Sequence, residues 1–79
     1  MTEDEAREKF LDIFQDWKVI SITKHKQDYI LAAVHKETPE EYDPFFSINA
    51  KTGEVQDYPF LTSPDRDEIM SKLKQAVSF

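Results

Sequence analysis

The chain has 79 residues with 16 acidic and ten basic side chains, which leave a formal net charge of -6. Its length allows one domain, which we place at residues 1–79, and a hydrophobic content of 39% suits a folded chain. The negative charge disfavours direct binding of nucleic acid or an anionic membrane surface, and the absence of cysteine excludes disulfides, thiolate metal sites and cysteine nucleophiles.

The first predicted element is a helix over residues 3–16. Thr2 followed by Glu5 has the form of a capping box, and acidic residues fill the first turn. Apolar residues then recur at helical spacing, at Ala6, Phe10, Ile13, Phe14 and Trp17.

Four strands are predicted next. Residues 19–23 are rich in β-branched side chains, and residues 29–35 are apolar at both alternating positions, which is typical of a central strand. Residues 36–43 are polar and acidic and predict an exposed loop. Residues 45–50 and 54–58 form a hairpin whose turn contains Gly53, the only glycine, at a position of positive φ.

The second helix is predicted to follow Ser63, with Pro64 in its first turn and an apolar stripe at Ile69, Met70, Leu73, Ala76 and Val77. The predicted fold class is therefore α+β, in the order α-β-β-β-β-α. We expect an antiparallel four-stranded meander with the two terminal helices packed on one face. The apolar side chains on the other face of the sheet then need to be covered. Either a second copy of the chain or a partner protein covers them, or the sheet is strongly twisted and Phe60 and Phe79 cover its ends.

The two histidines predict no site. His25 and His35 are expected to lie far apart on the surface, and neither stands in a sequence context of a known catalytic order. One glycine is too few for a phosphate-binding loop. We therefore expect no enzyme, no metal and no cofactor.

A row of carboxylates is the one feature that breaks a local rule. Acids recur every four residues in the predicted first helix, although like charges at this spacing destabilise a helix by about 0.2–0.5 kcal/mol per pair. Such a row can contact a basic protein surface, or it can be a solubilising face relieved by Arg7 and Lys9. Residues 17–36, in contrast, carry four bases and one acid. The candidate partner-binding residues are this carboxylate row, Asp4, Glu8, Asp12 and Asp16, and part of the acidic loop, Glu40, Glu41, Tyr42 and Asp43.

The segment 46–55, with Lys51-Thr52-Gly53-Glu54-Val55 at its turn, resembles the terminal hairpin of PepSY-like domains and of small bacterial immunity proteins. The whole chain also resembles short acidic orphan proteins of phages and prophages. This resemblance implies a bacterial or viral source and a role in binding a host protein, with no catalytic residues to carry over.

We therefore predict a small acidic protein-binding module, with the role of a phage or mobile-element inhibitor that occupies a surface of a host protein. The expected partner is a protein with a basic surface. The alternative is a homodimeric accessory protein whose open sheet face is its self-interface. No signal segment and no long apolar run are visible, so we expect a cytoplasmic protein without a membrane span.

Overall fold

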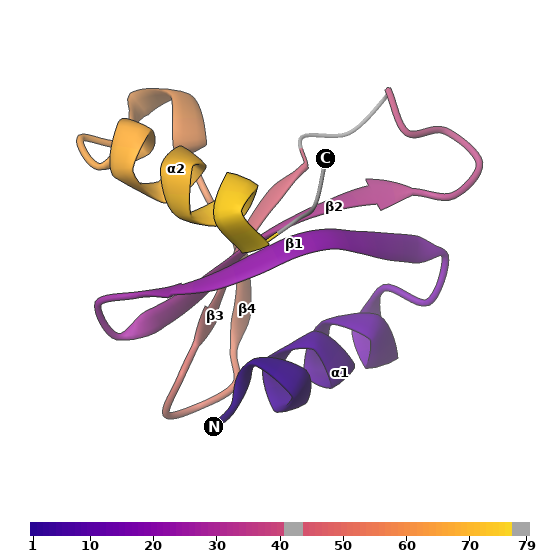
Figure 1. Ribbon diagram of the computed structural model, residues 1–79. Coiled ribbons are helices and arrows are strands. Elements are labelled where there is room, and N and C mark those ends of the chain that lie inside the picture. Colours follow the sequence, from indigo (N-terminus) through magenta and orange to yellow (C-terminus); the bar gives the residue numbers. More distant parts are fainter. Residues whose placement is uncertain (41–43, 77–79) are drawn as a thin grey trace.

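The computed structural model describes residues 1–40 and 44–76, with the side chains of all these residues except 75 and 76. Helix α1 (Glu3–Ile13) precedes strands β1 (Trp17–His25), β2 (Asp28–His35), β3 (Phe45–Asn49) and β4 (Val55–Asp57). A short 3-10 helix, η1 (Phe60–Thr62), and helix α2 (Arg66–Ala76) follow. The strands form one antiparallel sheet in the order β1-β2-β3-β4 (Figure 1). The predicted element order and meander are confirmed.

Helix α1 begins as predicted but ends earlier. Its capping box is present, with the Thr2 side chain accepting from the backbone of Glu5. The expected end at residue 16 is wrong, because Phe14 already leaves the helical region with φ -109° and ψ 71°. Trp17 instead starts β1 and pairs with His35. Sheet pairing thus overrides the apolar periodicity from which the longer helix was predicted.

The two helices cover opposite faces of the sheet, so the expectation that both pack on one face is wrong (Figure 1). Successive strand residues point to opposite faces, and the neighbours Ile30 and Leu31 of β2 lie in different cores. The core on the α1 side consists of Ala6, Phe10, Ile22, Tyr29, Leu31, Ala33, Phe46 and Ile48. The core on the α2 side consists of Ile30, Phe60, Ile69 and Leu73.

Strand β2 is central, as its two apolar sets predicted, and its two neighbours are β1 and β3. The second apolar set has its cover within the chain, because Ile30 packs with Ile69 and Leu73 of α2. The sheet face that was predicted to have no helix on it is therefore the face on which α2 lies.

Strand β1 is longer than predicted and contains a bulge. Val19 pairs with Ala33 and Ser21 with Ala32, so Ile20 is the extra residue. The bulge shifts the alternation, so that Val19 and Ile22 both pack in the core under α1 while Ser21 faces α2. There the Ser21 hydroxyl donates to the Leu73 carbonyl at 2.7 Å.

The β3–β4 turn forms as predicted around Gly53, which has φ +76°. A Cβ at this position would lie 2.8 Å from Cδ of Lys9, so the aliphatic part of the Lys9 side chain lies directly over the turn. The positive φ favours glycine here, whereas the flexible Lys9 side chain can move away from an added Cβ at small cost. Among the described residues, no helix is long and apolar enough to cross a membrane.

Candidate functional site

The carboxylate row is shorter than predicted. Asp4, Glu8 and Asp12 are exposed on α1, but Asp16 lies in the turn after the helix, because α1 ends at Ile13. One member of the row is paired, since Asp4 Oδ1 lies 3.0 Å from Nη1 of Arg7. The row is thus three exposed carboxylates on a helix followed by a fourth in a turn.

The predicted acidic loop is described only in part. Glu40 is exposed, whereas Glu41, Tyr42 and Asp43 lie outside the described residues. Two aromatic residues that follow this loop in the chain, Phe45 and Tyr58, are partly buried and have partners within the protein. Phe45 stacks on Phe60 with a centroid distance of 4.1 Å, and the Tyr58 hydroxyl lies 2.6 Å from Oγ of Ser63.

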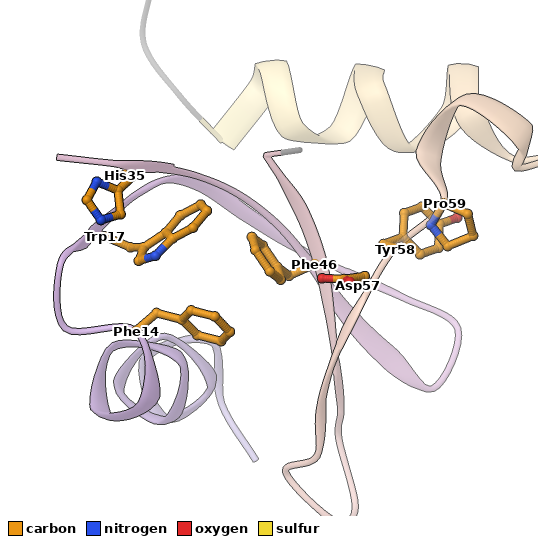
Figure 2. Close-up of a pocket in the computed structure, with 7 residues that line it drawn as sticks. All are labelled: Phe14, Trp17, His35, Phe46, Asp57, Tyr58 and Pro59. Carbon is orange, nitrogen blue, oxygen red and sulfur yellow. The ribbon is translucent and has the colours of Figure 1, made fainter. Parts of the chain in front are cut away.

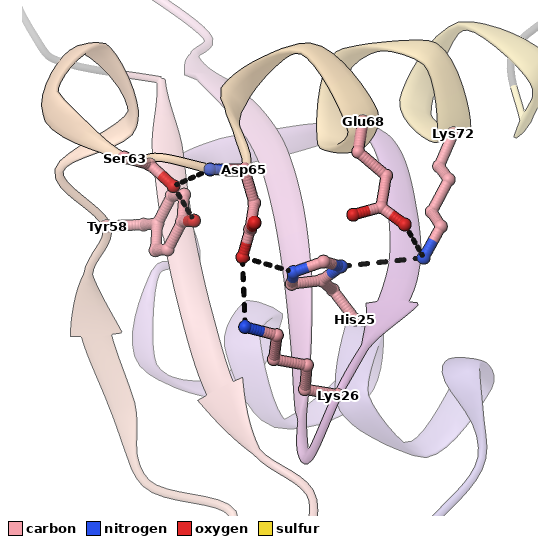
Figure 3. Close-up of polar contacts among 7 residues, drawn as sticks. All are labelled: His25, Lys26, Tyr58, Ser63, Asp65, Glu68 and Lys72. Carbon is pink, nitrogen blue, oxygen red and sulfur yellow. Dashed lines mark hydrogen bonds and ion pairs between the residues drawn. The ribbon is translucent and has the colours of Figure 1, made fainter.

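His25 is the centre of a polar cluster between the β1–β2 hairpin and α2 (Figure 3). Only 7% of the residue is exposed, so the expectation of a surface histidine is wrong. Its Nε2 lies 3.0 Å from Oδ2 of Asp65, and its Nδ1 lies 3.4 Å from Nζ of Lys72. The same Asp65 oxygen lies 3.1 Å from Nζ of Lys26, while Lys72 lies 3.8 Å from Oε1 of Glu68.

The contacts of His25 define its proton arrangement. The Lys72 ammonium can only donate, so Nδ1 of His25 accepts and the Nε2–H donates to Asp65. The hydrogen bond from His25, followed by that from Lys26, holds the pKa of the Asp65 carboxyl below its usual value of 3.8. The buried histidine therefore acts as a connector between a carboxylate and an ammonium group.

The cluster has a donor set that a metal ion could use. One ligand atom each from His25, Asp65 and Glu68 lie within 4.8 Å of one another. Two ammonium groups, Lys26 and Lys72, already contact these donors, however. A metal on Nε2 would also need the proton on Nδ1, facing Lys72. The residues present therefore suit a closed charge network better than a cation site.

An aromatic groove of about 710 Å³ lies elsewhere, where the end of α1 faces β3 and β4 (Figure 2). Its lining mixes aromatic rings with one carboxylate and one imidazole. We define the aromatic groove by the residues Phe14, Trp17, His35, Phe46, Asp57, Tyr58 and Pro59.

The early end of α1 creates this groove. Phe14 is the residue after the last helical turn, and Trp17 follows it at the start of β1. Their rings meet Phe46 of β3, with centroid distances of 5.2 Å from Phe14 and 5.3 Å from Trp17. A helix continuing to residue 16 would have placed these two side chains on the helix stripe, away from a sheet edge.

His35 is held within the groove by the loop that follows β2. Its Nδ1 accepts hydrogen bonds from the backbone N–H groups of Glu37 at 3.2 Å and Thr38 at 3.3 Å. It also meets the Trp17 indole edge-on, at a centroid distance of 5.7 Å. Its ring therefore has a defined orientation in the lining.

Sequence reasoning missed this groove because its residues come from four separate segments of the chain. The aromatic residues were visible, but they were assigned to a helix stripe and to strands. No local signal marked the helix end, because the helical spacing of apolar residues continues from Ile13 through Phe14 to Trp17. No family model, curated protein or solved structure matches the chain.

Proposed function

We propose that this chain is a protein-binding module without a catalytic role, which takes an extended segment of a partner protein in the aromatic groove. The observation that carries the proposal is the position of the groove, with an aromatic floor beside the edge strand β4. Tyrosine and tryptophan are favoured at protein interfaces, where they supply large apolar area at small entropic cost. Binding clefts typically have volumes of about 300–1,000 Å³, which includes this one.

The edge strand supports an extended partner. The Tyr58 N–H donates to the Phe45 carbonyl at 3.1 Å, so Tyr58 uses its backbone toward β3. In an antiparallel pair the bonding direction alternates along the strand, so the preceding residue, Asp57, directs its own N–H and C=O to the outer edge. No strand of the described chain lies beyond β4. A partner strand can add to this edge through main-chain hydrogen bonds, while its side chains enter the adjacent groove.

The alternative of a homodimeric accessory protein depended on an uncovered sheet face. Helix α2 occupies that face, with Ile69 and Leu73 packed on Ile30. The groove is therefore the better candidate for the contact surface. An inhibitory role on a host protein is retained in this proposal as the consequence of such binding.

The test is a selection of random linear peptides displayed on phage against the immobilised protein. Enriched peptides are then titrated against two variants of β4. Asp57→Tyr adds a ring at an exposed position in the groove lining, whereas Gln56→Tyr adds the same ring at an exposed position on the opposite strand face. We expect Asp57→Tyr to weaken binding about ten-fold or more, and Gln56→Tyr to change it less than about two-fold.

Two results would overturn the proposal. One is a failure to enrich any peptide on wild-type protein. The other is an equal response of Asp57→Tyr and Gln56→Tyr, which would place binding away from the groove. Light scattering of the wild-type protein checks the alternative, because a stable dimer at micromolar concentration would favour the accessory role.

A further inference from the structure

A second groove of about 410 Å³ lies between α1 and the edge strand β1 and is bordered by cations from three segments. We call it the basic groove and define it by its lining residues, which are the cations Arg7, Lys18 and Lys36, the amide side chain of Gln15 and the apolar side chains Leu11, Trp17 and Val19. Such a concentration of positive charge contrasts with the formal charge of -6 on the whole chain.

Among the described residues, only one of these cations has an acidic partner. Arg7 contacts Asp4 through Nη1 at 3.0 Å, which leaves its other guanidinium donors available. Lys18 and Lys36 are exposed, and neither forms an ion pair with an acid in residues 1–40 and 44–76. The groove therefore offers donors and an apolar wall at the same place.

The basic groove adjoins the aromatic groove. Trp17 lines both of them, and Lys36 of the basic groove directly follows His35 of the aromatic groove. A ligand that fills one groove is thus at the border of the other. The backbone here is held in place, because the Lys36 N–H donates to the Asp16 carbonyl at 2.8 Å.

We propose that the basic groove binds a carboxylate side chain of the partner segment, and so selects partners with an acidic residue next to an apolar one. This inference rests on the proposed function, and it adds that the bound partner segment carries an acidic side chain. A carboxylate accepts charge-assisted hydrogen bonds from Arg and Lys. Acids farther than about 8 Å from the groove oppose this attraction little at physiological salt, whereas Asp4, which lies 3.0 Å from Arg7, offsets part of the charge of that guanidinium.

The acidic preference differs from the expectation of a basic partner, which came from the carboxylate row. Asp4, Glu8 and Asp12 of that row lie at exposed positions of α1 and Asp16 lies in the turn after it. None of the four lines either groove, although Asp4 pairs with Arg7 of the basic groove. Among the described residues that line the two grooves, the cations are Arg7, Lys18 and Lys36 and the carboxylate is Asp57, so the lining has a positive balance even though Asp4 offsets part of the Arg7 charge.

The peptide selection described above tests the inference when it is repeated with charge variants. The double variant Lys18→Gln/Lys36→Gln removes two charges at exposed positions of the basic groove. The matched control is Lys51→Gln/Lys74→Gln, which removes two charges at exposed positions outside both grooves. We expect peptides enriched on wild-type protein to carry Asp or Glu beside an apolar residue.

An enriched acidic peptide should bind the groove variant about five-fold more weakly and the control less than two-fold more weakly. Its affinity for wild-type protein should also fall as salt is raised. Enrichment without acidic residues, or equal weakening in both double variants, would overturn the inference. If the enriched peptides still bind Asp57→Tyr more weakly than wild type, the proposed function stands without the inference about the basic groove. If no peptide is enriched, both the proposed function and the inference are wrong.

Discussion

The Nε2 atom of His25 lies 3.0 Å from Oδ2 of Asp65, and this contact joins the β1–β2 hairpin to the segment that leads into α2. Forty residues separate the two partners in sequence. Together with the bond from Ser21 to Leu73, it attaches α2 to the sheet near both ends of the helix. These contacts help to hold α2 on its own face of the sheet.

Removing the His25 side chain should destabilise the protein. His25→Ala deletes a buried ring that connects Asp65 and Lys72, and we expect a loss of about 1–3 kcal/mol in the free energy of unfolding. Urea unfolding followed by Trp17 fluorescence measures this. Gln27→Ala, at an exposed turn position two residues away, is the control and should change the free energy by less than about 0.5 kcal/mol.

The stability of the protein should depend on pH through Asp65. The folded-state pKa of Asp65 is lowered, so the folded protein binds fewer protons than the unfolded chain. This stabilisation is complete above the unfolded pKa of 3.8 and is lost as the pH falls through the lower folded pKa. Wild type should therefore lose more stability than Asp65→Asn between neutral and acidic pH. Parallel pH profiles of the two urea midpoints would contradict the assignment.

The Ser21 hydroxyl should contribute to stability as a cap for α2. Leu73 is among the last four residues of the helix, whose carbonyls have no partner within it. Ser21→Ala leaves the Leu73 carbonyl without its 2.7 Å donor, and we expect a cost of about 1–2 kcal/mol. Ser21→Thr retains the hydroxyl, and hydrogen exchange at the end of α2 should rise only in the alanine variant.

Lys26 combines backbone strain with an ion pair. It has φ 57°, a conformation that costs a residue other than glycine about 1–2 kcal/mol, and its Nζ lies 3.1 Å from Asp65. Lys26→Gly relieves the strain but loses a pair that is largely exposed and contributes about 0–1 kcal/mol. We expect the glycine to stabilise the protein more in the Asp65→Asn background than in wild type. Equal effects in both backgrounds, measured by thermal unfolding, would show that the pair contributes nothing.

Gly53 should resist substitution mainly because of its positive φ, since the flexible Lys9 side chain that lies over it can move aside. Gly53→Ala places a methyl group 2.8 Å from Cδ of Lys9 and forces alanine into φ +76°. We expect a loss of about 1–2 kcal/mol. The Lys9→Ala background relieves the steric part alone, so a residual cost there measures the conformational part. Full recovery in that background would contradict a conformational requirement.

The sequence predicted most of the local structure, because its signals are short-range. The capping box of Thr2 and Glu5, the alternation in β2 and the glycine turn at Gly53 each act within a few residues. The candidate site was not predictable in the same way. Phe14 and Phe46 are 32 positions apart, and only packing brings their rings to 5.2 Å.

What the sequence alone determined is the α+β element order, the position of the turns and the central place of β2. Only the tertiary structure decided which face each helix covers, because both alternating sets of β2 are apolar and favour either arrangement equally. It also decided that Trp17 belongs to a strand, since pairing with His35 and contact with Phe46 stabilise it there more than one further helical turn could. The aromatic groove follows from that choice.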